Sequence, residues 1–348
     1  MVVEKRDEKV GGTYMETLLE VNHLVTEFRT ADGNVQAVRD VSFSVAKGET
    51  LCIVGESGCG KSITSLSVIG LLPSNGKIAS GEVKYEGKPI HDLPYEELRK
   101  MRGTKISMIF QEPMTALNPV LTVGYQLREP LILHHKISKS EATKQGIELL
   151  KQVGIPYPEK RMNQYPHELS GGMRQRVMIA IALACHPGLL IADEPTTALD
   201  VTIQAQILDL INDLKEKLNM GVMMITHDMG VVAEVADRVM VMYAGKKVEE
   251  GSVQEIFDHP KHPYTIGLLN SVPNIDDPDF ELEPIPGSLP SLQEEIQGCR
   301  FHPRCKFAMD KCRELTPPEF KTVEGHVVSC WLHEEVEEVK HGHLVTQI

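Results

Sequence analysis

Long hydrophobic runs and an excess of positive charge are both missing from this chain of 348 residues. It contains no run of about 18 apolar residues, so no helix is predicted to span a bilayer. The 36 Lys and Arg residues are outnumbered by 49 Asp and Glu residues, which gives a net charge of −13. This balance disfavours nucleic acid as the main partner, because phosphate backbones bind basic surfaces. With 41% hydrophobic and 24% charged residues, we expect a globular protein of one large or two modest domains.

Cysteines are few, and the beginning of the chain lacks the apolar core of a signal peptide. The first fourteen residues are charged, and we expect residues 1–15 to form a loose tail. Without a secretion signal, the seven cysteines are expected to be reduced or metal-bound rather than paired as disulfides.

The most informative stretch is the glycine-rich loop at residues 55–62, whose sequence is GESGCGKS. It fits the P-loop pattern G-x-x-x-x-G-K-[ST], with an apolar strand-like run before it and a helix-like segment at 63–72 after it. Its glycines let the backbone fold around phosphates, and successive N–H groups then face the anion. Lys61 is expected to reach the β- and γ-phosphates of a nucleotide, and the Ser62 hydroxyl to bind Mg²⁺.

The region before this loop is rich in β-forming residues. Three short strands are predicted, at 18–21, 25–28 and 41–45, with a turn at 32–34. We expect them to form a small antiparallel sheet. Phe28, near a strand end, could stack on an adenine or simply pack within the sheet.

Polar residues follow three further apolar strands of the chain. Gln111 ends one of them, Asp193 and Glu194 end the second, and His227 follows the third. Asp193 suits Mg²⁺, and Glu194 can polarise a water molecule aligned on a γ-phosphate. Gln111 could reach the metal and that water, and His227 could bind the γ-phosphate. A plain structural role is the alternative for each residue taken singly.

A proline-interrupted region at about 112–168 is predicted to be a mostly helical insertion into an α/β core. It ends in the sequence LSGGMRQR at 169–176, which opens a further helix. Ser170, Gly171 and Gly172 could form a second anion site from N–H groups and a hydroxyl. An ordinary serine helix cap is the alternative.

Taken together, these motifs resemble the ATP-binding cassette of ABC transporters, in order and spacing, over roughly residues 16–260. The Ser170 loop is the discriminating motif, because other P-loop ATPases lack it. The resemblance implies an α/β P-loop NTPase core with an antiparallel β subdomain and a helical subdomain at about 112–180. An irregular, cysteine-containing C-terminal extension would occupy 261–348.

The resemblance also implies roles for individual residues. Glu194 would be the general base, while Gln111 and His227 would sense the γ-phosphate. Two cassettes would form a head-to-tail dimer, with each ATP held between the P-loop of one and the Ser170 loop of the other. Hydrolysis would open the dimer and drive membrane partners through the helical subdomain near Gln111. Mg²⁺ would be held by Ser62, Gln111 and Asp193. Contacts to the nucleotide would come from Phe28, Gly55, Ser57, Gly58, Cys59, Gly60, Lys61, Ser62, Ile63, Gln111, Ser170, Gly171, Gly172, Asp193 and Asp200.

The subfamily is narrowed by the segments at 55–58, 111–119 and 262–265 and by the tail after them, which look like ATP-binding subunits of oligopeptide and dipeptide importers. Peptide is therefore the expected cargo, with nickel chelates and oligosaccharides as alternatives. The implied partners are two membrane-spanning permease subunits, a second ATPase subunit (the same chain or a paralogue) and, indirectly, an extracellular or periplasmic peptide-binding protein. The implied location is the cytoplasmic face of the membrane, as a peripheral subunit. A soluble ABC ATPase of repair or translation is disfavoured by the single cassette, the short insertion and the acidic balance.

The proline-rich segment after about residue 260 is predicted to have few regular elements. Within it lie four cysteines spaced C-x5-C-x6-C-x17-C. This spacing lacks the C-x2-C pairs of structural zinc sites, whereas four thiolates would suit a 4Fe–4S cluster. A bound metal would supply order that packing cannot give so small a segment. Zinc, disulfides and free thiols are the alternatives for Cys299, Cys305, Cys312 and Cys330.

Overall fold

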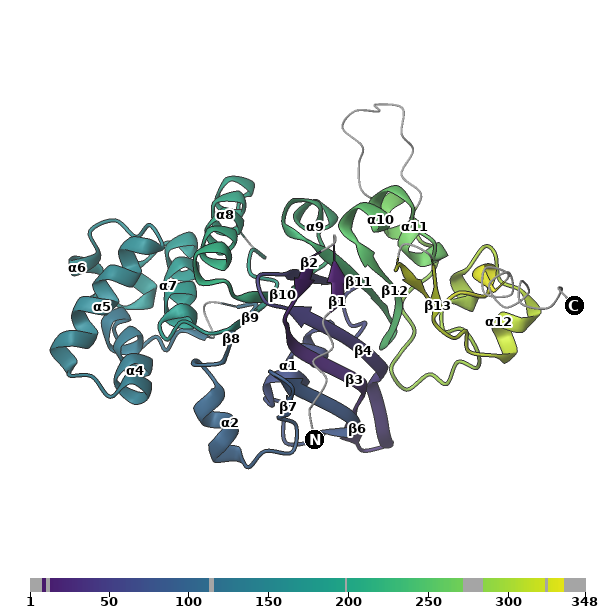
Figure 1. Cartoon of the computed structure of the whole chain (residues 1–348), viewed down its shortest axis with the longest axis horizontal. Coiled ribbons are helices and arrows are strands. Elements are labelled where there is room, and N and C mark those ends of the chain that lie inside the picture. Colours follow the sequence, from purple (N-terminus) through teal and green to yellow (C-terminus); the bar gives the residue numbers. More distant parts are fainter. Residues whose placement is uncertain are drawn as a thin grey trace, which may run out of the picture.

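The computed structural model describes residues 8–10, 13–112, 116–197, 199–271, 284–322 and 325–334. Most of the expected N-terminal tail, residues 113–115 of the peptide-importer motif, and Ala198 lie outside the described residues. Figure 1 shows three parts side by side: a group of helices, a central region of two sheets, and the C-terminal extension at the opposite end from the helices.

The central sheet has eight strands in the order β13-β14-β12-β11-β5-β10-β9-β8. Its strands β11, β5, β10, β9 and β8 are mutually parallel, and every residue of β5, β9 and β10 is buried. Burial on both faces explains why these strands are almost wholly apolar in sequence. Their carboxyl ends share one edge, where the P-loop and the predicted polar residues lie. The bounds are β5 Thr50–Val54, β8 Ile106–Ile109, β9 Leu189–Asp193, β10 Gly221–Thr226, β11 Arg238–Tyr243, β12 Lys246–Ser252, β13 Phe320–Lys321 and β14 Val327–Val328.

A second, antiparallel sheet has the order β4-β3-β6-β7. The prediction of separate strands at 18–21 and 25–28 was wrong, because β3 runs unbroken from Thr17 to Thr30. His23 takes a left-handed φ of 51°, and the pairing register shifts around it without ending the strand. The other bounds are β4 Gly33–Ala46, β6 Gly76–Tyr85 and β7 Lys88–Pro89, with a separate hairpin of β1 Glu8–Val10 and β2 Thr13–Met15.

The helices differ from the predicted ones mainly at their ends. Helix α1, Lys61–Ile69, stops short of residue 72 because Gly70 adopts the left-handed conformation of a helix C-cap. Helix α4, Val123–His135, continues through Pro130, which was expected to interrupt it. The remaining helices are α2 Tyr95–Met101, α5 Lys139–Gln152, α6 Pro158–Arg161, η1 Pro166–Glu168, α7 Gly171–Leu183, α8 Val201–Leu218, α9 Met229–Val235, α10 Val253–Asp258, α11 Pro263–Asn270, η2 His302–Arg304, α12 Asp310–Glu314 and η3 Trp331–His333.

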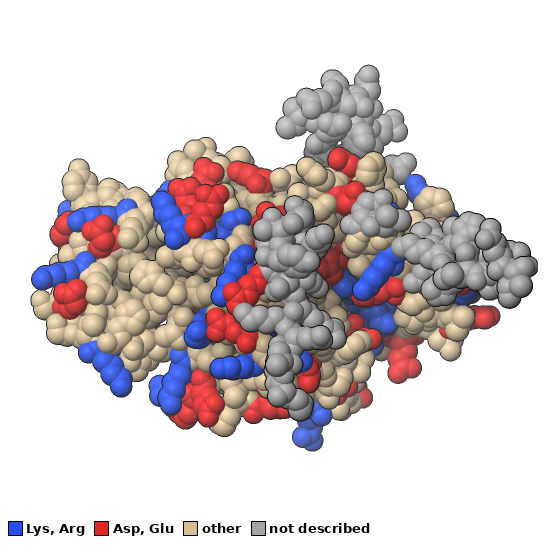
Figure 2. Space-filling view, in the orientation of Figure 1, with Lys and Arg blue, Asp and Glu red and all other residues tan. Residues whose placement is uncertain are grey.

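The C-terminal extension is joined to the core more closely than its composition predicted. Strand β14 pairs with β12, and β13 pairs with β14, so the extension adds two strands to the central sheet. In the described part of the chain, no helix combines the length and apolar character needed to cross a bilayer. On the face drawn in Figure 2, acidic and basic side chains are interspersed.

Candidate functional site

The P-loop lies between the end of β5 and the start of α1, and its glycines are required by close backbone approaches. Gly55 has a φ of +147°, and a Cβ there would lie 2.2 Å from the carbonyl oxygen of Met242. Gly60 has a φ of +110°, and its Cβ would lie 2.7 Å from the carbonyl oxygen of Ala37. Neither position accepts a side chain without moving backbone. Within the loop, Cys59 is buried, whereas Ser57 and Gly58 are exposed.

Lys61 and Ser62 begin α1 and connect the P-loop to its surroundings. The buried Lys61 ammonium donates to the carbonyl oxygens of Gly55 at 2.6 Å and Glu56 at 3.0 Å. The Ser62 hydroxyl donates to Oδ1 of Asp193 at 3.0 Å. A hydroxyl beside a carboxylate is the oxygen donor set that Mg²⁺ prefers, so these residues fit the predicted metal. The pKa of Asp193 is raised, chiefly by burial.

Glu194 is the centre of a hydrogen-bonded group formed at the ends of different strands. Its Oε2 accepts from the Gln111 amide at 2.9 Å, and its Oε1 lies 3.1 Å from Nδ1 of His227. Burial alone would raise the pKa of Glu194, but hydrogen bonds from His227 and Thr197 outweigh it and lower the pKa. Glu194 also has a φ of +46°, which is uncommon for a residue with a side chain and is found disproportionately at functional sites.

Thr197 was missed in the sequence. Its hydroxyl donates to Oε2 of Glu194 at 3.0 Å, from the turn that follows β9. Its position three residues after the predicted base was a possible signal, because a turn brings residues i and i+3 close together.

The Ser170 loop caps a helix in this chain. The Ser170 hydroxyl accepts from the N–H of Met173 at 3.3 Å, at the start of α7, and both Ser170 and Gly171 are exposed. A Cβ on Gly172 would lie 2.9 Å from Cγ2 of Ile203 in α8. Within the described parts of the chain, no hydrogen bond joins Ser170 to the P-loop.

Asp200 and Phe28 each make contacts of their own. The Asp200 carboxylate caps α8 by accepting from the N–H of Ile203 at 2.9 Å. Phe28 is half-buried near the tip of the β3–β4 hairpin and packs closely on Gly76, where a Cβ would lie 2.7 Å from its Cε1. The ring is therefore supported by β6 and still partly open. Ile63 is half-buried in α1.

Comparisons with known proteins identify the family. Residues 38–197 match the protein-family model described as ABC transporter. Residues 248–312 match the family model for the C-terminal region of oligopeptide/dipeptide transporters. The dipeptide transport ATP-binding protein DppD of Bacillus subtilis is 54% identical over 92% of this chain and 96% of its own length. The chain belongs to the ABC transporter ATP-binding family. The oligopeptide transport ATP-binding protein OppD of Escherichia coli is 50% identical over 95% of this chain and 97% of its own.

Solved structures confirm the predicted α/β P-loop fold of the ABC cassette. The cassette MJ0796, in a dimeric post-hydrolysis state bound to ADP and Pi, has a TM-score of 0.62 and 31% identity. The match covers 68% of this chain and 99% of the MJ0796 chain. CbiO1 of Clostridium perfringens, part of the ABC transporter complex CbiONQ, has a TM-score of 0.59 and 29% identity over 70% of this chain and 91% of its own. As a member of this family the chain is an ATPase, for which ATP and Mg²⁺ are expected.

The C-terminal extension of this ABC ATPase contacts the P-loop directly. Arg304 forms an ion pair with Glu56 at 2.7 Å, and the Tyr264 hydroxyl accepts from the N–H of Glu56 at 2.8 Å. Cδ2 of Leu289 lies 3.7 Å from the position that a Cβ on Gly58 would take. The residues of the extension are more than 200 positions from the loop in sequence, so no local pattern could reveal the contact.

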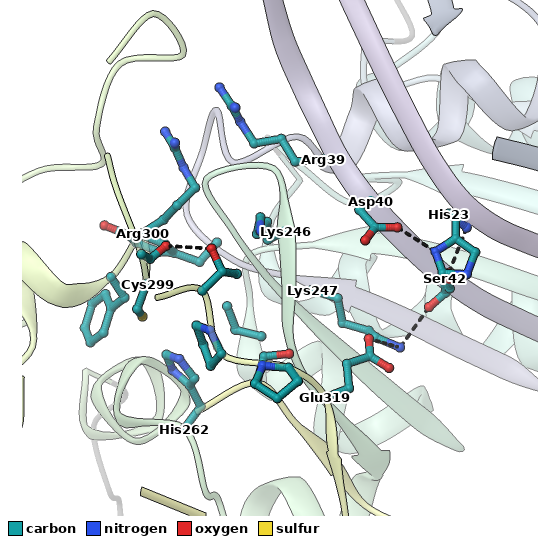
Figure 3. A pocket seen from close by; sticks show the side chains of 18 residues that line it. His23, Arg39, Asp40, Ser42, Lys246, Lys247, His262, Cys299, Arg300 and Glu319 are labelled. Atoms are coloured by element: carbon teal, nitrogen blue, oxygen red, sulfur yellow. Dashed lines mark hydrogen bonds and ion pairs between the residues drawn. The ribbon is translucent and has the colours of Figure 1, made fainter. Parts of the chain in front are cut away.

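A cavity of about 290 Å³ lies along the boundary between β4, the β11–β12 turn and the extension (Figure 3). Arg39, Lys246 and Arg300 line it, and none of the three forms an ion pair with a carboxylate of the described residues. In Figure 3 the side chains of Arg39 and Arg300 extend toward the same side. The pKa of Lys246 is lowered chiefly by burial; Asp40 opposes this effect, and the neighbouring charges of Arg300 and Arg39 add to it. Three cations are thus crowded at this boundary.

The four tail cysteines are unpaired and line one small cavity together with Trp331. The backbone N–H of Cys299 donates to the carbonyl oxygen of Cys312 at 2.8 Å. Burial raises the pKa of Cys330 to about 12 and also raises that of Cys299 and Cys305, which favours neutral thiols. Throughout the described ranges, no three His, Cys, Asp or Glu side chains are grouped so as to hold a metal ion. The structure therefore does not support the predicted 4Fe–4S or zinc site as a formed metal centre.

Proposed function

We propose that this chain hydrolyses ATP to power the import of dipeptides or oligopeptides through an ABC transporter. The observation that carries the chemistry is the Glu194 group, in which a candidate base, an amide and an imidazole are hydrogen-bonded beside the Ser62–Asp193 pair. The cargo is supported by the relatives, which are named for dipeptide and oligopeptide transport.

In the proposed reaction Glu194 is the general base. Its lowered pKa keeps the carboxylate ionised, and it accepts a proton from the water that attacks the γ-phosphate. Gln111 and His227 orient that water and bind the γ-phosphate. Ser62, Gln111 and Asp193 would hold Mg²⁺, which neutralises charge on the phosphates when bound. Lys61 would bind the β- and γ-phosphates from the start of α1, where its ammonium now contacts two P-loop carbonyls.

The nucleotide site is proposed to be completed by a second cassette. Exposure of Ser170 and Gly171, and their lack of a hydrogen bond to the P-loop of the same described chain, fit a role across a dimer interface. Backbone N–H groups at the start of α7 and the Ser170 hydroxyl would then bind the γ-phosphate of the facing subunit. Gly172 would hold the loop against α8, and Asp200 would lie at the same interface. Phe28 would stack on the adenine in its own subunit.

The wider assembly is proposed by the same family relation. Residues 16–260 would form the cassette, the helical part at about 112–180 would contact the permease, and 261–348 would be the extension. Two membrane-spanning permease subunits and a second ATPase chain, identical or paralogous, would complete the transporter. A peptide-binding protein outside the membrane would act indirectly, and this chain would lie peripherally on the cytoplasmic face.

Reconstitution tests this proposal. The chain is co-purified with its permease subunits, incorporated into proteoliposomes and supplied with ATP, and uptake of a labelled dipeptide and a labelled pentapeptide is measured. Uptake that depends on ATP supports the proposal. Uptake of a nickel chelate or an oligosaccharide instead of peptide overturns the cargo, and purification without any permease favours a soluble ATPase.

We also propose that Cys299, Cys305, Cys312 and Cys330 bind a 4Fe–4S cluster. Support comes from four unpaired thiols placed around one cavity, a donor set that suits iron and sulfide. The cavity measures about 10 Å³, room for about one water, so the thiols would have to move apart around a cluster. The four thiols are not grouped to hold a metal ion among the described residues, so a cluster and the alternative zinc ion would both require the cavity to rearrange.

Metal analysis of anaerobically purified protein tests this site. Equal amounts of iron and acid-labile sulfide, lost in Cys312→Ser but kept in Cys185→Ser, support the cluster. Cys185 is a matched control because it is a buried thiol outside the four. Stoichiometric zinc, or no metal, contradicts it.

A further inference from the structure

The P-loop residue Glu56 is held by the C-terminal extension through both its side chain and its backbone. Arg304 Nη1 donates to Oε2 of Glu56 at 2.7 Å and Nη2 donates to Oε1 at 3.0 Å, which is a bidentate pair. The Glu56 N–H donates to the Tyr264 hydroxyl at 2.8 Å. The Arg304 side chain is only 6% exposed, so solvent screens this pair less than a surface salt bridge.

Arg304 is itself fixed in place. Its Nε donates to the carbonyl oxygen of Pro286 at 2.7 Å, and its guanidinium lies 5.8 Å from the centre of the Tyr243 ring. Tyr243 packs edge-on against Tyr264 at 4.7 Å and against Phe301 at 5.1 Å between ring centres. The guanidinium therefore contacts the end of β11 and is presented to the P-loop in one geometry.

The same contact affects the charge and the lysine of the nucleotide site. A carboxylate inside a phosphate-binding loop would repel the phosphates, and Arg304 neutralises it. The carbonyl oxygen of Glu56 accepts from Lys61 at 3.0 Å, so fixing Glu56 also fixes the partner of the P-loop lysine. Loss of Arg304 would leave a half-buried carboxylate next to the bound anion, which is worse than having neither partner.

The turn that carries Arg304 is also the turn that carries two of the cysteines. Arg304 ends η2 and is followed by Cys305, while Phe301 and Cys299 precede it. Phe301 contacts the aromatic cluster and lines the cavity of the four thiols. The thiols and the guanidinium are therefore carried by one short segment, packed on the same aromatic cluster.

We propose that Arg304 is a positioning residue for the P-loop, and that the cysteine-bearing turn sets the affinity for ATP by holding Arg304 on Glu56. This inference rests on the proposed function only in taking ATP as the bound nucleotide. It requires neither a metal in the cysteine site nor peptide as cargo.

A double-mutant cycle on the full-length chain tests the positioning role. Equilibrium binding of Mg²⁺ and a fluorescent ATP analogue is measured for the wild type, Arg304→Met, Glu56→Gln and the double variant. Arg304→Met should weaken binding at least about tenfold, and the double variant should recover most of the loss because no carboxylate is left unpaired. Arg313→Met, an exposed arginine of α12, is the control and should bind like the wild type.

The role is overturned if Arg304→Met binds like Arg313→Met, or if the double variant binds no better than Arg304→Met. With the permease present, the loss should appear as a raised KM for ATP rather than a lowered kcat, since Arg304 does not reach Glu194. A fall in kcat alone also overturns it. If the wild type binds no ATP, the proposed function fails instead, so the two failures are distinguishable.

The link to the thiols has its own test. Cys305→Ser should weaken ATP binding in the wild-type background and have no further effect in Arg304→Met, because the route through the guanidinium is already lost. An equal loss in both backgrounds, or no loss in either, contradicts the link. Circular dichroism of each variant verifies that it is folded, and Cys299→Ser replaces Cys305→Ser if that variant does not fold.

Discussion

The edge of the central sheet and the C-terminal extension reach the same P-loop by different means. At the sheet edge, parallel strands end side by side, so polar residues at their ends meet although Gln111 and Glu194 are 83 positions apart. In the extension, Arg304 reaches Glu56 across 248 positions with no strand pairing between the two residues. Regular architecture makes the first kind of contact predictable from sequence, whereas the second depends on how an irregular segment folds back.

The largest effect is expected at the sheet edge, from Glu194→Gln. This variant keeps the side-chain size but removes the base, so phosphate release by the reconstituted transporter should fall about 10²- to 10⁴-fold. ATP binding should persist, and the variant should form a stable dimer with Mg²⁺ and ATP, seen by light scattering.

Glu216→Gln, an exposed position on α8, is the matched control and should keep wild-type turnover. Near-normal phosphate release by Glu194→Gln would show that Glu194 is not the general base. The contact between the extension and the P-loop would be unaffected by that result.

A smaller effect is expected where the core meets the extension, from Lys246→Met. Removing one of three neighbouring cations should raise the free energy of unfolding slightly, by roughly 0.5 kcal/mol after solvent screening of this partly exposed group, measured by urea denaturation of the full chain. Because the pKa of Lys246 is lowered in the folded state, the protonated side chain destabilises the fold. This free-energy penalty is fully present below the lowered pKa. The penalty disappears as the pH rises toward the ordinary lysine value, so the advantage of the variant should shrink at alkaline pH.

Lys217→Met, on the exposed face of α8, should leave the unfolding free energy nearly unchanged at every pH. A Lys246→Met variant less stable than the wild type would show that the charge is compensated at the boundary.

The smallest effect is expected from Thr197→Val. Loss of its hydrogen bond removes one of the contacts that lower the pKa of Glu194, so that pKa should rise. Because hydrolysis needs the ionised base, the acid limb of the kcat profile should move to higher pH. Thr202→Val, exposed on α8, should leave the limb in place, and an unmoved limb in Thr197→Val would exclude the threonine from the Glu194 group.

The sequence predicted the P-loop and the strand-end residues because their chemistry depends on local spacing. Glycines at required positions, and acids after buried strands, are visible without a fold. The sequence prediction failed for β3, because His23 takes a left-handed conformation within one continuous strand. It also failed for α4, because that helix continues through Pro130. Both failures arise because tertiary packing overrides local signals that would end an element.

The extension was predictable in its family and in its cysteine content, but its contacts with the core were not. That β13 and β14 join the central sheet could not be inferred, because two-residue strands carry no periodic pattern. Nor could Arg304 be distinguished from other arginines of the tail, since its importance comes from one long-range contact. The four cysteines were visible as a group, but whether they hold a metal depends on distances that spacing does not fix.

The central claim is that the extension and the sheet edge form one nucleotide site, and amide hydrogen exchange of the P-loop tests it most directly. Exchange across residues 55–62 is compared in the wild type and Arg304→Met without nucleotide, with α8 as an internal reference. The account predicts faster exchange in the P-loop of the variant and unchanged exchange in α8. Equal exchange in the P-loops of both proteins would contradict it.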